Sequence, residues 1–143
     1  MEGIMKKLII MLAITIVSVA SIAQQGGKTA SASGASVYIV HPHDGGTVSG
    51  TFTVIFGLEG MGVAPAGVER QNTGHHHLVI DGVDTINLAM PLGGDVSHFG
   101  GGQTQTSLTL PAGKHTLQLI LGDYLHTPHN PPLLSEKITI TVE

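Results

Sequence analysis

Three consecutive histidines stand at the start of an apolar run in the stretch TGHHHLVID (73–81). Neutral imidazole is the commonest protein ligand for zinc and copper, and it also suits nickel and iron. If this run is a β-strand, residues two apart point to the same face. His75 and His77 could then chelate one ion together, whereas His76 would share the core face with Leu78.

The chain holds nine histidines, and the other six fall in predicted loops, turns or strand starts: His98 in a glycine-rich loop, His115 at a strand start, His126 and His129 in a proline-bent loop, and His41 and His43 in a turn. A zinc site needs three or four donors that converge at about 2.0–2.1 Å. The expected ligands are His75, His77, His98 and His126, with His76 and His115 as inner ligands or as residues that orient the ligands. We expect no histidine in the middle of a strand. One conflict stays open, because His115 starts its strand and could lie at the opposite end of the domain.

Several other residues are candidates for the surroundings of such a site. Asp123 is the expected carboxylate partner, and Gln103, which follows three glycines, is expected beside the ligands. Met61 and Met90 could add thioether donors for Cu(I). The weaker ligand candidates, which are more typical of ordinary polar positions, are His41, His43 and His129.

Two other interpretations of the histidines stay open. In the first, the chain is a structural or adhesion module, and His76 and His115 hydrogen-bond to loop carbonyls or to Asp123 to hold a corner. In the second, the chain is a metal-dependent enzyme, which would need an open coordination position and a nearby acid or base. Glu69 is the candidate for that acid or base. We expect metal binding without catalysis.

The N-terminal residues 1–23 are typical of a cleaved secretory signal peptide. Lys6 and Lys7 precede an apolar run at 8–19, and small residues precede a predicted cleavage before Gln24. The apolar run is shorter than the roughly 20 residues of a membrane span, so we expect no membrane span after cleavage. Residues 24–34 are small and polar, which predicts a flexible linker. The expected location is periplasmic or extracellular.

Charge and composition exclude several function classes. After residue 23, four Lys and Arg face nine Asp and Glu, a balance of −5 with neutral histidine. A nucleic-acid binder would need a basic face, so none is expected as a partner. The chain has no cysteine, which removes thiolate as a ligand or nucleophile. The expected partners are a metal ion and, secondarily, another envelope protein.

The elements that must position these histidines are predicted to be strands. Alternating apolar residues, such as Leu117, Leu119 and Leu121, indicate strands with one buried face. The predicted strands span 36–40, 51–58, 75–81, 104–110, 114–123 and 135–143. Short strands separated by Gly- and Pro-rich turns, with no helical period, predict an all-β domain at 35–143, an antiparallel immunoglobulin-like sandwich of about seven strands.

Four long stretches resemble one family of exported bacterial proteins, the domain-of-unknown-function family 4399. They are GMGVAPAG (60–67), NTGHHHLVID (72–81), HFGGGQTQTSLTLPAGKHTLQLILGD (98–123) and PHNPPLLSEKITITV (128–142). The resemblance covers about residues 36–142 and implies no particular activity. It extends to the run 100–104 and to the histidines His75, His76, His77, His98, His115 and His126. The first turn of the family is more often Ser/Thr-Pro-x-Asp-Gly, so His41 and His43 are departures that we keep out of the main site.

Overall fold

The computed structural model describes residues 28–82, 86–94 and 96–143. The predicted signal peptide and the linker residues 24–27 lie outside this part. Every regular element within it is a strand: β1 (Ser36–His41), β2 (Thr47–Val48), β3 (Thr51–Glu59), β4 (Gly62–Val63), β5 (Thr73–Ile80), β6 (Ser97–His98), β7 (Gln105–Thr109), β8 (Gly113–Gly122) and β9 (Ile138–Val142). None of the described residues belongs to a helix long and apolar enough to cross a membrane.

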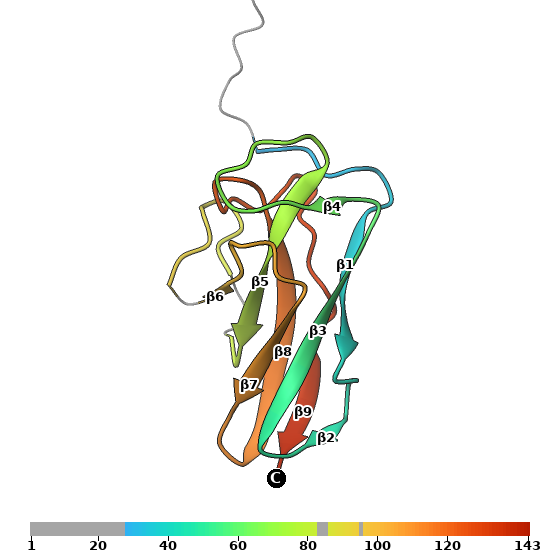
Figure 1. The fold of residues 1–143 in the computed structure, drawn as a ribbon, viewed down its shortest axis with the longest axis vertical. Coiled ribbons are helices and arrows are strands. Elements are labelled where there is room, and N and C mark those ends of the chain that lie inside the picture. The colour runs from blue at the N-terminus through green and yellow to red at the C-terminus, as the bar shows by residue number, and fades with distance from the viewer. Residues whose placement is uncertain (1–27, 83–85, 95) are drawn as a thin grey trace, which may run out of the picture.

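The strands form two sheets that share one core (Figure 1). The smaller sheet has the order β1-β3-β7, and the larger has the order β2-β9-β8-β5-β4, with β6 paired to β5. The long strands pair antiparallel, while the two-residue strands β2 and β4 pair parallel with β9 and β5. This confirms the predicted all-β class, and the arrangement is compatible with an immunoglobulin-like sandwich. All six predicted strands are present.

The core lies between the sheets and follows the alternation in the sequence. Leu117, Leu119 and Leu121 of β8 are all fully buried, as their two-residue spacing predicts. They pack in one cluster with Val54 and Phe56 of β3, in the opposite sheet. Burying one such side chain stabilises the fold by roughly 1.5–3 kcal/mol, so this cluster holds the two sheets face to face.

The strand that carries the three histidines begins earlier than predicted. β5 starts at Thr73, two residues before the predicted start, so the histidines lie inside the strand and the expectation of none in mid-strand is wrong. Its first two residues pair with β4, in a region whose glycines and prolines predict irregular structure. Gly74 permits this, because a Cβ there would lie 2.6 Å from the carbonyl oxygen of Gly122 on β8.

Part of the predicted linker is attached to the domain. Ala30 forms a β-bridge with Asn130, whose backbone N–H donates to the Thr29 carbonyl at 2.9 Å. The Ser31 hydroxyl donates to the carbonyl of Pro131 at 2.9 Å. We call residues 28–31 the N-terminal strap. It crosses the end of the molecule where β5 begins and β8 ends (Figure 1).

Candidate metal centre

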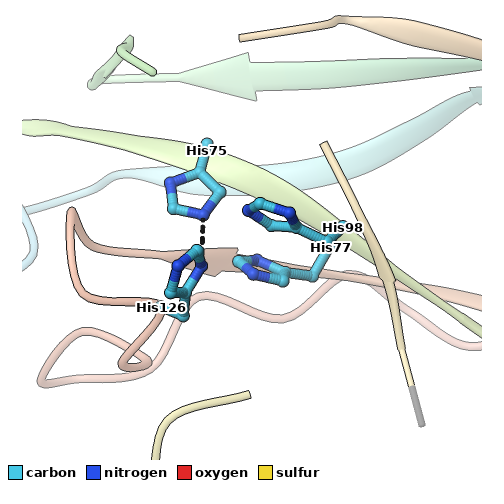
Figure 2. A group of neighbouring side chains, drawn as sticks. All are labelled: His75, His77, His98 and His126. Atoms are coloured by element: carbon cyan, nitrogen blue, oxygen red, sulfur yellow. Dashed lines mark hydrogen bonds between the residues drawn. The ribbon is translucent and has the colours of Figure 1, made fainter. Parts of the chain in front are cut away.

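Four histidines from three separate segments converge on one point (Figure 2). His75 and His77 come from β5, His98 from β6, and His126 from the loop after β8. One ring nitrogen from each lies within 4.8 Å of the nitrogens of the other three. Ring centroids are between 4.5 and 5.8 Å apart. Nε2 of His75 and Nδ1 of His126 are 3.1 Å apart, which is hydrogen-bond distance.

Strand pairing accounts for three of the four positions. His75 and His77 project from the face of β5 opposite to the core side chain of Leu78, as the two-residue period predicts. His98 stands directly across from His77 in the antiparallel β5–β6 ladder, and directly opposed residues share a face. The ladder therefore brings His98 onto the face that already carries the two β5 rings.

The fourth ring is held by a tight loop. His126 follows the end of β8 by four residues and has a left-handed backbone conformation, with a φ of 65°. Its backbone N–H donates to the Asp123 carbonyl at 2.9 Å, and its own carbonyl accepts from Leu92 N–H at 2.8 Å. These contacts hold the ring beside His75, near the start of β5.

Two glycines leave room for the rings. A Cβ at Gly122 would lie 2.6 Å from the His77 ring, and a Cβ at Gly100 would lie 2.2 Å from the His98 ring. Distances below 3.0 Å require an atom to move. The sequence signal for Gly100 is the glycine run, whereas nothing in the sequence marks Gly122 as a neighbour of His77.

The two β5 rings are buried with unpaired nitrogens. His75 and His77 are both 0% exposed, while His98 is exposed and His126 is half-buried. Nδ1 of His75 and both ring nitrogens of His77 lack a hydrogen-bond partner. A buried polar group left unpaired costs roughly 1–3 kcal/mol. A neutral imidazole has one lone pair, and a metal ion would take one such lone pair from each of these rings.

Burial also keeps these rings neutral. Loss of solvent and, to a smaller extent, positive charge on the neighbouring rings together lower the pKa of His77 to about 3 and that of His75 to about 4. Burial and the nearby His126 ring lower the pKa of His98 as well. Neutral imidazole is the form that binds metal, so these rings present free lone pairs at pH 7 with little competition from protons.

The four nitrogens fit a metal ion after a small contraction. In a tetrahedral zinc site with bonds of about 2.0–2.1 Å, donor atoms are about 3.4 Å apart. The His75–His126 pair is already at 3.1 Å, and the widest separation is within 4.8 Å.

His76 points the other way, into the core, as predicted. Its ring is 1% exposed and lies 5.1 Å from the Phe56 ring, centroid to centroid. Burial lowers its pKa, which the nearby backbone of Gln103 partly opposes, yet neither ring nitrogen makes a hydrogen bond of normal geometry. The structure therefore does not bring His76 to the four-histidine cluster.

His115 lies at the far end of β8. It precedes Gly122, the partner of His75, by seven positions, which corresponds to about 24 Å at roughly 3.4 Å per residue. Its Nδ1 lies 2.7 Å from Oδ2 of Asp81, and its Nε2 lies 2.8 Å from the Pro111 carbonyl oxygen. The bond to Asp81 raises the His115 pKa. His115 therefore lies at the end of the sandwich opposite to the cluster, which settles the question that the sequence left open. There it holds a corner through its contacts with Asp81 and Pro111.

The weaker candidates also lie outside the cluster. His129 is buried, with ring nitrogens 3.3 Å from the Leu121 carbonyl and 3.2 Å from the Thr73 carbonyl, so it ties the β5 and β8 backbones together. The remaining four are placed as follows: His41 and His43 at the end of β1 with ring centroids 6.3 Å apart, Met61 against the core, and Met90 58% exposed in the 86–94 loop.

Gln103 and Asp123, the two residues expected beside the ligands, make hydrogen bonds to loop backbone. Oε1 of Gln103 accepts from the Gly101 N–H at 2.9 Å and so holds the turn after β6. Asp123 makes no hydrogen bond to a histidine ring, although its charge acts to raise the pKa of His75. Glu69 lies on the wall of a small pocket of about 160 Å³, together with Asp123, and is not one of the four converging groups.

Fold and site together define an all-β sandwich with a four-histidine cluster that could hold a metal ion. Residues 54–143 match the family described as a domain of unknown function, DUF4399, and the chain belongs to that family. The resemblance in the sequence is therefore confirmed, over a shorter range than the expected 36–142. Neither the curated proteins nor the solved structures contain a match.

Proposed function

We propose that this protein binds one transition-metal ion, copper or zinc, through His75, His77, His98 and His126. The observation that carries the proposal is His77, a buried ring with two unpaired nitrogens inside a group of four converging imidazoles. A fold that leaves such a ring unpaired loses stability, and a bound ion recovers it because the lone pair becomes a metal bond.

The donor chemistry favours Zn(II) or Cu(II). The four groups are imidazole nitrogen donors, without thiolate or carboxylate among them. Cu(I) prefers sulfur ligands, but Met61 packs against the core and so is not available to the cluster. The predicted signal peptide supports a role outside the cytoplasm, and we propose metal handling or buffering within the cell envelope, with another envelope protein as the secondary partner.

The alternative, a structural or adhesion module with a hydrogen-bonded histidine corner, has less support at the cluster. His75 and His126 make the one hydrogen bond among the four rings in the described residues, and three buried nitrogens there stay unpaired. The corner role fits His115 at the other end of the sandwich. An enzyme would need an acid or base beside the metal, and Glu69 is not among the converging groups.

The test is metal binding by the tag-free protein purified from the cell envelope. We expect one equivalent of copper or zinc by elemental analysis. Saturation at 100 times the dissociation constant should stabilise the fold by about 2.7 kcal/mol. The double variant His75→Ala/His77→Ala should lose the metal and keep its β-sheet circular dichroism, while His115→Ala, a histidine at the far end, should bind as the parent does. Absence of metal in the parent, with no shift of its melting temperature on adding either ion, would contradict the proposal.

A further inference from the structure

Asp123 is a buried carboxylate at the start of the loop that carries His126. It is 4% exposed. Its Oδ1 accepts from the backbone N–H groups of Leu125 and Thr127, each at 2.9 Å. Its Oδ2 accepts from the hydroxyl of Thr29 at 2.7 Å. One carboxylate oxygen of Asp123 therefore binds the loop backbone, and the other binds the N-terminal strap.

The same residue closes the loop through its backbone. The Asp123 N–H donates to the Thr127 carbonyl, and its carbonyl accepts from the His126 N–H, both at 2.9 Å. His126 has a φ of 65°, a conformation that non-glycine residues rarely adopt. Because this backbone is intrinsically unfavourable, the loop depends on the Asp123 contacts to keep the His126 ring at the cluster.

Thr29 reaches this carboxylate from 94 residues earlier in the chain. The strap is itself anchored on both sides of Thr29, because Ala30 bridges to Asn130 and Nζ of Lys28 donates to the carbonyl of Leu88. The loop that contains Leu88 also supplies Leu92, which donates to the His126 carbonyl. The strap therefore connects the two loops that meet at His126.

We propose that Thr29 is a positioning residue of the metal centre, acting through Asp123 to hold His126 at the ion. The inference rests on the proposed function. Its hydroxyl makes the one hydrogen bond to Oδ2 within the described residues. Without that bond a buried carboxylate oxygen has no partner, and an unpaired buried polar group is costly. The loop then opens toward solvent, and the cluster falls from four imidazoles to three.

The test compares Thr29→Val, which keeps the shape and removes the hydroxyl, with Thr29→Ser, which restores it. The metal readouts are Cu(II) affinity and the number of coordinated imidazoles from electron paramagnetic resonance. Thr29→Val should weaken binding about 10-fold or more, as loss of residues that orient ligands does, and show three imidazoles. Thr29→Ser should show four. The matched control is Ser31→Ala, which removes a hydroxyl of the same strap that does not reach Asp123.

A second readout needs no metal. In the metal-free protein, hydrogen exchange of the Leu125 and Thr127 amides should accelerate about tenfold in Thr29→Val and stay unchanged in Ser31→Ala. Parental affinity with four imidazoles in Thr29→Val would overturn the inference, whatever the exchange rates. If the parent bound no metal, the proposed function would fail, and faster exchange would then show that Thr29 holds the loop for another purpose.

Discussion

The central residue of the site is His77, whose ring has no hydrogen-bond partner in the metal-free protein. His77 is fully buried, and neither of its ring nitrogens has a partner. The neighbouring rings do not supply one, because the hydrogen bond in the cluster joins His75 to His126 and leaves both nitrogens of His77 unpaired. A residue that costs stability in the empty protein is typical of a functional position.

His77→Leu tests this residue directly. The substitution removes two unpaired buried nitrogens and replaces them with apolar volume. We expect the metal-free variant to be as stable as the parent or up to about 1–3 kcal/mol more stable, while metal no longer raises its melting temperature. Urea denaturation with and without chelator measures both effects. A metal-free variant that is several kcal/mol less stable would show that the ring has a structural role that our interpretation omits.

At the scale of elements, the site depends on three strands and their register. The β5–β8 ladder sets Gly122 opposite His75, and the β5–β6 ladder sets His98 opposite His77. A shift of either ladder by one residue would move the rings to the other face, because the side-chain period of a strand is two. Gly122 has no side chain, and the ring of His77 lies in the space that a side chain at this position would need.

Gly122→Ala should therefore damage the site more than the fold. The new Cβ would lie 2.6 Å from the His77 ring and would push it away from the other three. We expect at least a tenfold loss of metal affinity by calorimetric titration. Gly93→Ala is the control, because a Cβ there meets nothing within 4 Å. Unchanged affinity in Gly122→Ala would mean that His77 is not a ligand or that its ring has a second usable position.

At the scale of the whole molecule, the sandwich separates two kinds of histidine. One end holds the four-histidine cluster, in which burial lowers the pKa values of His75, His77 and His98. The other end holds His115, whose pKa is raised by its hydrogen bond to Asp81. Partial burial acts to raise the pKa of Asp81. The hydrogen bonds from His115 and from the Thr116 N–H outweigh this effect, so the pKa of Asp81 is lowered. Residues this far apart contribute independently to stability.

The His115–Asp81 pair predicts how stability changes with pH at that end. A histidine with a raised folded pKa stabilises the protein fully below its ordinary value of 6.5, and this contribution is lost as pH rises through the folded pKa. The Asp81 contribution is present above its ordinary value of 3.8 and is lost as pH falls through its lowered folded pKa. The advantage of the parent over Asp81→Asn should be greatest between these two values.

Denaturation of both proteins with chelator, from pH 4 to pH 9, measures this difference. The four-histidine cluster is the same in both proteins, so its contribution cancels in the comparison. We expect the advantage of the parent to shrink as pH rises above 6.5. A difference that stays constant across this range would show that His115 is not charged in the folded protein.

The local sequence was sufficient for the strands and for their faces. Alternation placed Leu117 and Leu119 in the core, set His75 and His77 on one face, and turned His76 to the other, because the two-residue period is a property of the strand alone. The alternation did not predict where β5 begins, because that depends on pairing with another strand. β5 begins at Thr73 because β4 pairs with its first two residues.

What only the tertiary structure decided is which histidines meet. His126 is 51 residues from His75, and Thr29 is 94 residues from Asp123. No spacing rule connects such positions, because their approach depends on ladder register and on the path of two loops. The same fact separates His115 from the cluster, since a strand start and a strand end lie at opposite poles of a sandwich. The sequence by itself therefore determined the class of the fold and the kind of chemistry, and the packing of distant segments determined the place where that chemistry can occur.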